Sequence, residues 1–553
     1  MQISKTEKIL IMLFFAATWA VLALNAGGPI FSDEFLYIDA GLRNFPVPNY
    51  GNRYFHIYLQ KLFMALAPTP LIGVRIFWGF LIAGTAALIY SNARTFIKHS
   101  SPLHGLLALA IFFSYPLITE YSGEPAVDIT AMAMVTLYVS VYLFALRNPD
   151  RKRIALIVLG ALAFIAFKTK ETTVFVNFLL LGFALDEEGK WNWRALRDLI
   201  RPLLTGLAAG IGLFILLDGL ILGKPFFAIS PATFAAVFKN YDFQPGFFFG
   251  PTSWYKVYFL DELLLPFLLF ILSAVKLGSK TDTRRRLVWI YPLILAIFVT
   301  WNMLKVTFGF IERFYFPALP VIAMLAPQYL HITWPDSRKK WLMFTFMAAG
   351  AAGLLLILRS AMITYSASFH FEFLRFLDSI YYPILISILI GAAIWSKKFH
   401  WAVSIIPLFC IAAMLLSPLL YTYKYFFAYP KVQERYDLLF YPFETFKDEL
   451  ITEAADKLLI SADIKRSLEM LSDDPNDITG MANFFFDWRI GRDSVAIGYN
   501  LPGMQTALVS KDIDQALISG EDWQALSSQA GIAAKYDATI DQSGQVVLLT
   551  SNK

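Results

Sequence analysis

Long apolar runs recur along most of this chain, and they restrict its fold more than any other feature. A helix needs about 20 apolar residues to cross roughly 30 Å of hydrocarbon, and fewer suffice where the bilayer is locally thin. By this criterion the sequence predicts about thirteen membrane-spanning helices, so residues 1–420 are predicted to form an all-α polytopic membrane protein. The predicted spans are 7–25, 71–92, 103–119, 127–146, 154–167, 172–185, 203–222, 263–277, 287–303, 314–331, 341–358, 380–395 and 401–420.

The charged residues divide the chain into two parts. Residues 421–553 carry 12 Lys and Arg against 20 Asp and Glu, a net charge of −8, whereas residues 1–420 carry 35 against 22, a net charge of +13. This division indicates a basic part beside anionic lipid and an acidic part in water. Because the basic residues are spread over short loops between apolar runs, the excess does not indicate nucleic-acid binding. The single cysteine, Cys410, excludes a disulfide within the chain.

The distribution of basic residues predicts the orientation. Placing Met1 in the cytoplasm puts the basic clusters 151–153 and 284–286 in cytoplasmic loops, as the positive-inside rule requires. The first apolar run resembles a signal peptide, but its length and the many spans after it favour an uncleaved helix. An odd number of spans then places residues 421–553 on the outer side.

Two long outer loops, 27–70 and 223–262, contain aromatic and apolar residues at helical spacing, which favours helices lying in the membrane interface. A simple aromatic belt is the alternative. The C-terminal part, 421–553, is predicted to form a small α/β domain. Its predicted elements are strands 457–461, 495–498, 506–510 and 545–550 and a helix over 463–471.

The first outer loop begins with two adjacent carboxylates, Asp33 and Glu34, just before a predicted interfacial helix. They can cap that helix, bind a cation, or supply a general base and a residue that positions it. In the second outer loop, Glu124 precedes a span and Asp128 lies at its start, where burial of a carboxylate is costly.

Cationic side chains also occur at the outer ends of predicted spans. Lys168 and Lys170 lie in a short hairpin that ends at Glu171, and Arg313 lies at the mouth of a later span. Lysines at this depth suit a phosphate headgroup, or they extend to the lipid surface without binding a ligand. The guanidinium of Arg313 can hold a phosphate through two hydrogen bonds.

The order of these short motifs resembles a known family. The acidic pair at 33–34 followed by Tyr37, the run from Arg313 to Pro320, and Lys170 directly after a span are similar to motifs of the GT-C membrane glycosyltransferases. Within that family the protein mannosyltransferase and aminoarabinose transferase group is most similar. Glu171 departs from the pattern, because the family often has Gly or Pro there. The likeness extends over essentially the whole membrane part.

The resemblance implies an enzyme of the bacterial inner membrane. Such enzymes move a sugar, with inversion, from a polyprenyl-phosphate donor to a hydroxyl-type acceptor on a lipid, glycan or protein at the outer face. Asp33 then corresponds to the base, and Lys170 and Arg313 correspond to phosphate ligands. Tyr315 and Tyr37 fall at donor-binding positions. Asp128 resembles the second acidic position, which Glu124 also fits, and the C-terminal domain would be periplasmic.

The acids could hold Mg²⁺ or Mn²⁺, which prefer oxygen ligands. The resemblance nevertheless implies no obligatory metal, and the two histidines predicted outside, His56 and His370, do not have ligand spacing. A transporter or flippase of lipid-linked substrates is the alternative function, and it predicts charges near the membrane centre. A sugar polymerase or ligase of another membrane class would use the same donors without the acidic pair.

Overall fold

The computed structural model describes residues 5–25, 37–38, 40–41, 53–68, 70–96, 102–114, 118, 126–185, 190–239, 270, 273, 291, 316–328, 446, 458–461, 495–499, 501–510, 513–542 and 544–552. The chain divides into two compact units. The larger comprises Met1–Gly28 and Ala40–Tyr423, and the smaller comprises Pro29–Asp39 and Lys424–Lys553. The predicted division into 1–420 and 421–553 stays a prediction.

The larger unit is helical in its described residues. Its α-helices are α1 (Lys5–Asn25), α3 (Tyr54–Leu66), α4 (Pro70–Phe96), α5 (Pro102–Ser114), α7 (Val127–Arg147), α8 (Lys152–Phe167), α9 (Trp193–Leu222), α10 (Pro231–Lys239) and α13 (Leu319–Leu325). Its 3-10 helices are η3 (Pro149–Arg151), η4 (Glu171–Ala184) and η5 (Phe227–Ile229).

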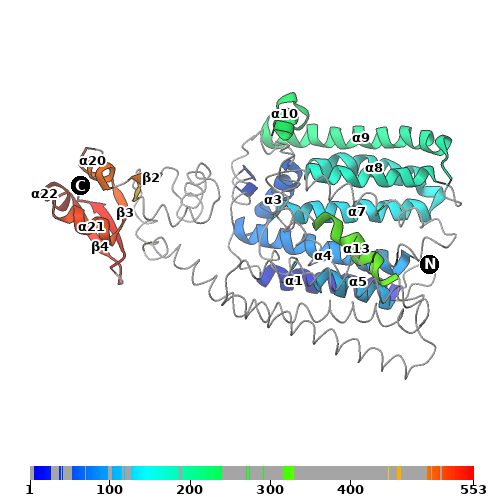
Figure 1. Ribbon diagram of the computed structural model, residues 1–553, viewed down its shortest axis with the longest axis horizontal. Helices are drawn as coiled ribbons and strands as arrows, with labels where there is room; N and C mark the ends of the chain where they lie inside the picture. Colours follow the sequence, from blue (N-terminus) through cyan, green and yellow to red (C-terminus); the bar gives the residue numbers. More distant parts are fainter. Residues whose placement is uncertain are drawn as a thin grey trace, which may run out of the picture. The chain divides into compact units, whose positions relative to one another are not determined.

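The long helices lie side by side in a sequence of pairwise contacts (Figure 1). Helix α9 packs on α8, α8 on α7, α7 on α4, and α4 on both α1 and α5. Four of the described helices, α1, α4, α7 and α9, are long and apolar enough to cross a membrane. The short helices α3 and α10 lie at one end of this array (Figure 1).

Glycine allows the backbones of α8 and α9 to touch. A Cβ atom on Gly206 of α9 would lie 1.8 Å from the carbonyl oxygen of Ile157, and one on Gly160 of α8 would lie 2.2 Å from that of Leu203. Small residues at helix contacts are typical of membrane proteins, where close packing replaces the hydrophobic driving force between helices.

Helix α9 begins at Trp193, ten residues before the predicted span 203–222. Asn192 caps the helix by accepting a hydrogen bond from the backbone of Ala195 (3.2 Å). Pro202 lies inside the helix, where it removes one backbone donor without ending the helix.

The predicted span 172–185 is a 3-10 helix, η4, rather than an α-helix. A 3-10 helix rises about 2.0 Å per residue against 1.5 Å in an α-helix. Its 14 residues therefore extend about 28 Å, close to the hydrocarbon thickness despite the short segment.

Several predicted spans lie largely or wholly outside the described residues, so the number of thirteen stays a prediction. These spans are 263–277, 287–303, 341–358, 380–395 and 401–420. Span 314–331 overlaps α13, which is completely buried.

The smaller unit contains a mixed five-stranded sheet with the order β2-β1-β3-β5-β4. Strand β1 runs parallel to β2 and β3, whereas β5 runs antiparallel to β3 and β4. The strands are β1 (Leu458–Ser461), β2 (Val495–Tyr499), β3 (Gln515–Ser519), β4 (Tyr536–Ile540) and β5 (Val546–Ser551), and the helices are α20 (Leu501–Ser510), α21 (Gly520–Ser527) and α22 (Ala530–Ala533).

The strands predicted at 457–461, 495–498 and 545–550 are confirmed as β1, β2 and β5. The strand predicted at 506–510 is wrong, because this segment belongs to α20. Met504, Ala507 and Leu508 are buried together, and this spacing of three and four residues is that of a helix face. The prediction also missed β3 and β4, and the predicted helix 463–471 lies outside the described residues.

Candidate functional site

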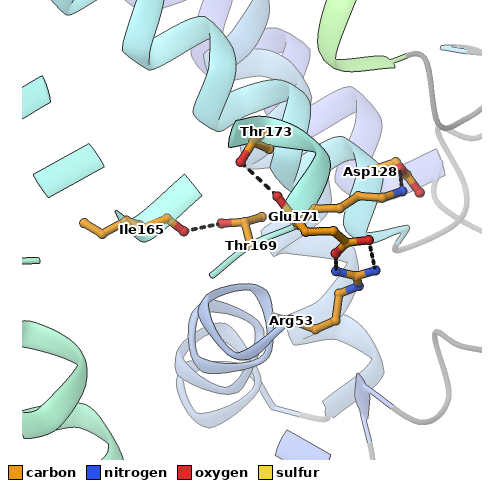
Figure 2. A network of polar contacts seen from close by, with 7 residues as sticks. Arg53, Asp128, Ile165, Thr169, Glu171 and Thr173 are labelled. Atoms are coloured by element: carbon orange, nitrogen blue, oxygen red, sulfur yellow. Dashed lines mark hydrogen bonds and ion pairs between the residues drawn. The ribbon is translucent and has the colours of Figure 1, made fainter. Parts of the chain in front are cut away.

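The turn Lys168–Glu171 joins α8 to η4 and carries three of the residues selected from the sequence. Backbone hydrogen bonds hold it to the last turn of α8, from Lys168 N to Phe164 O (2.9 Å) and from Lys170 N to Ala166 O (3.0 Å). The hydroxyl of Thr169 donates to Ile165 O (3.0 Å), and that of Thr173 donates to Lys170 O (2.8 Å) (Figure 2). The turn therefore has a fixed backbone from which its charged side chains project.

The side chain of Lys170 forms an ion pair with Asp128, the second residue of α7 (Figure 2). Both side chains are buried, with relative exposures of 3% and 1%. A carboxylate in the first turn of a helix is favoured by the helix dipole, and here it also offsets a buried ammonium. The structure thus brings together two residues that the sequence analysis had assigned to different roles.

Glu171 forms a second ion pair with Arg53, the residue before α3. Arg53 Nη1 lies 2.5 Å from Glu171 Oε2, and Nη2 lies 3.5 Å from Oε1. These side chains are 18% and 14% exposed. Arg53 was not among the residues predicted from the sequence, although its position just before a helical apolar pattern in an outer loop was an available signal.

Lys168 is also buried, and its ammonium lies over aromatic rings. Its Nζ atom is 4.8 Å from the ring centroid of Phe234, 5.6 Å from that of Phe167 and 5.9 Å from that of Phe164. A cation over aromatic faces is attracted by their quadrupoles. Nearby, the buried carboxylate of Asp218 accepts hydrogen bonds from Tyr58 Oη and Ala228 N, both at 2.6 Å.

Burial lowers the pKa of both lysines. The pKa of Lys170 falls to about 8, with the nearby carboxylate of Asp128 opposing the shift, and that of Lys168 falls to about 8, with Asp218 opposing it. The described cations Arg53, Lys168 and Lys170 thus lie among three carboxylates, so the formal charge around the turn is close to balanced.

His56 of α3 is buried, and its Nδ1 lies 2.7 Å from the hydroxyl oxygen of Thr130, the fourth residue of α7. Burial, with a contribution from Arg53, lowers the pKa of His56 to about 3. The ring is therefore neutral at any physiological pH. This hydrogen bond ties α3 to α7 beside Asp128.

The other predicted site residues divide into two groups. Tyr37 is described and its side chain is buried. Asp33, Glu34, Glu124, Arg313 and Tyr315 lie outside the described residues. Among the residues that the structure describes, no group of three or more His, Cys, Asp or Glu side chains could hold a metal ion.

Neither a protein-family model nor a curated protein sequence matches this chain. Solved structures do match. The crystal structure of ArnT from Cupriavidus metallidurans bound to undecaprenyl phosphate aligns with a TM-score of 0.53 at 13% identity, covering 99% of this chain and 98% of ArnT. The apo state of the same protein gives a TM-score of 0.52 at 13% identity, covering 98% and 97%. An oligosaccharyltransferase from Archaeoglobus fulgidus aligns with a TM-score of 0.41 at 11% identity, covering 100% of this chain and 74% of that one. The GT-C resemblance is thereby confirmed as a likeness of fold.

Proposed function

We propose that this chain, which has the fold of the transferase ArnT, is an inverting glycosyltransferase of the bacterial inner membrane. It would take a hexosyl or pentosyl group from a polyprenyl-phosphate donor and pass it to a hydroxyl on a lipid, glycan or protein acceptor, such as lipopolysaccharide. The main support is that the likeness covers nearly the full length of both chains. The ArnT crystal structure contains undecaprenyl phosphate, a polyprenyl phosphate of the kind that the proposed reaction would release.

The proposed reaction is a single displacement. Asp33 removes the proton from the acceptor hydroxyl while Glu34 and Tyr37 position the reactants. The acceptor oxygen then bonds to the anomeric carbon as the bond from that carbon to the phosphate oxygen breaks. One positioned base is sufficient for such an inverting displacement.

The leaving phosphate gains negative charge during this step, because a phosphodiester becomes a phosphomonoester. Cations that hold the phosphate therefore stabilise the transition state more than the ground state. We assign this role to Lys170 and Arg313, with Tyr315 orienting the phosphate or the sugar. Asp128 keeps the buried Lys170 charged, and Arg53 adds a second cation beside the turn.

The local balance of charge explains why one lysine would not be sufficient. Each cation described around the turn already lies near a carboxylate: Arg53 by Glu171, Lys170 by Asp128 and Lys168 by Asp218. A phosphate that gains charge needs a further positive group, and Arg313 is our candidate. Glu124 is a second candidate for the acidic position, and no divalent cation is required in this scheme.

The test is transfer by the purified protein in proteoliposomes, using polyprenyl-phosphate sugars labelled in the sugar. We expect one labelled donor to lose its sugar to an acceptor with EDTA present. Asp33→Asn should abolish transfer while donor binding persists, and Asp198→Asn, an exposed carboxylate on α9, serves as the matched control. Movement of intact donor between leaflets without sugar release would instead indicate a flippase.

A further inference from the structure

Asp218 connects three separate segments near the end of α9. One oxygen of its carboxylate accepts a hydrogen bond from the hydroxyl of Tyr58 in α3. The other accepts one from the backbone N–H of Ala228 in η5, and both distances are 2.6 Å. Its backbone carbonyl accepts the N–H of Lys224 at 3.2 Å. Burial and the carboxylate raise the pKa of Tyr58, so its hydroxyl keeps the proton that it donates.

The chain after α9 forms a compact segment, Gly223–Ala235, which we call the loop base because it begins the second long outer loop. Gly223 ends α9 with a φ of 64°, a left-handed conformation that glycine adopts without strain. Within the loop base, the Thr233 hydroxyl donates to Phe227 O (2.8 Å) and lies 2.9 Å from the Ser230 hydroxyl. The segment is therefore held together by its own hydrogen bonds.

Aromatic contacts hold the loop base against α3 and the Lys168–Glu171 turn. The ring of Phe227 meets that of Tyr54 edge-on at 4.9 Å between centroids, and Phe234 stacks on Phe167 at 6.0 Å. The Lys168 ammonium lies 4.8 Å from the Phe234 ring centroid. The same turn therefore carries Lys170 toward α7 and Lys168 toward the loop base.

A buried lysine and a buried aspartate are costly unless each is compensated. If the loop base needed only to be covered, apolar side chains at 168 and 218 would be sufficient. A cation over specific rings, attracted by the Asp218 carboxylate, favours one orientation of the loop base instead.

We infer that Asp218 and Lys168 are positioning residues that dock the loop base on α3 and on the turn carrying Lys170. The inference rests on the proposed function for its consequence: a correctly docked loop base sets the shape of the donor site. Lys168 accordingly serves as an anchor for the loop and not as a phosphate ligand.

The docking can be measured without an activity assay. Spin labels at Ala235, exposed in the loop base, and at Leu66, exposed on α3, report the distance between these segments once Cys410 is replaced by alanine. We expect a narrow distance distribution in the parent protein and a broader or shifted one in Asp218→Asn and Lys168→Met. Tyr58→Phe should give an intermediate result, since it removes one hydrogen bond and keeps the ring.

Two matched controls keep this test specific. Asp198→Asn makes the same change at an exposed position of α9, and Lys190→Met removes an exposed lysine; both should leave the distribution unchanged. If Asp218→Asn and Lys168→Met give the same distance distribution between the spin labels as these controls, the two residues do not dock the loop base.

The kinetic consequence separates positioning from general instability. In folded Asp218→Asn and Lys168→Met, the KM for the lipid donor should rise about tenfold, the order of effect of losing one contact to a charged group, while kcat changes little. Loss of kcat with unchanged donor KM would contradict the positioning role. If no variant, parent included, transfers sugar but the distance distribution still depends on Asp218, the docking stands and the proposed function fails.

Discussion

Lys170 and Asp128 form a buried ion pair across 42 residues of sequence. The pair fixes the start of α7 to the turn between α8 and η4, in the larger of the two units. A charge that has lost its partner at such a depth is strongly destabilising, so the pair makes the position of the turn sensitive to either residue.

Asp128→Asn should therefore destabilise the protein by about 3–5 kcal/mol, the usual cost of leaving one buried charge unopposed. Lys170→Met combined with Asp128→Asn should recover most of that loss, since no unpaired charge remains. Thermal unfolding in detergent of the parent, Asp128→Asn, Lys170→Met and the double variant measures the interaction energy between the two side chains. Equal stability of Asp128→Asn and Asp198→Asn would show that the pair contributes nothing.

Donor binding should weaken as the pH rises through about 8. Burial lowers the pKa of Lys170 to about 8, so its ammonium is mostly charged at about pH 7 and mostly neutral at about pH 9. The donor phosphodiester stays ionised over this range, so losing the charge of Lys170 should raise the donor KM about tenfold. A donor KM that stays constant over this range would contradict the role of Lys170.

Stability should change in the opposite direction over part of this range. Because the folded-state pKa of Lys170 lies below that of the unfolded chain, the unfolded state binds more protons between about pH 8 and the ordinary lysine value of 10.5. The contribution of Lys170 to the free energy of unfolding therefore rises with pH there. The slope of the free energy of unfolding against pH, compared between the parent protein and Lys170→Met, isolates this contribution. Identical slopes would show that the pKa of Lys170 is not lowered in the folded state.

Arg53→Ala should raise the donor KM about tenfold, because it removes a cation and leaves Glu171 to repel phosphate. Adding Glu171→Gln should restore part of the affinity. The direct effect on stability should stay within about 1 kcal/mol, since the pair is partly exposed and screened by solvent. Steady-state kinetics with the lipid donor measures these KM values. If the double variant has the same donor KM as Arg53→Ala, Glu171 does not repel the phosphate.

Two glycines of α9 should respond differently to alanine. A Cβ on Gly206 would lie 1.8 Å from Ile157 O, so Gly206→Ala must separate α8 from α9 and should cost about 1–3 kcal/mol. Gly212→Ala meets nothing within 4 Å among the described atoms, and it should stabilise the helix by up to about 1 kcal/mol. Thermal unfolding distinguishes them, and a tolerated Gly206→Ala would contradict the close packing.

The sequence predicted the long described helices of the larger unit, because a long apolar run has few alternatives to a helix. The start of α9 was missed because spans were predicted from apolar residues, and the first turns of this helix contain the charged residues Arg194, Arg197 and Arg201. The run 506–510 was interpreted as a strand because the buried residue Met504, which reveals the helical period of α20, lies outside it.

The charged residues of the site were found more readily than their pairings. Lys168, Lys170, Asp128 and Glu171 stood out as charges at the ends of spans. That Lys170 would pair with Asp128, and Glu171 with Arg53, depends on which helices lie beside each other, and no local pattern contains this information. Arg53 had a signal in the sequence, its position just before a helical apolar pattern in an outer loop, but its pairing with Glu171 depends on where α3 lies.

Following both halves of a doubly labelled donor would show whether this protein transfers the sugar and leaves the phosphate on the lipid. A polyprenyl-phosphate sugar carrying one label in the sugar and another in the phosphate is incubated with the protein and a membrane extract as the acceptor source. We predict that the sugar label moves to the acceptor with parent protein while the phosphate label stays on the lipid, and that Asp33→Asn moves neither while still binding the donor. Transfer by Asp33→Asn at the parent rate would exclude Asp33 as the base.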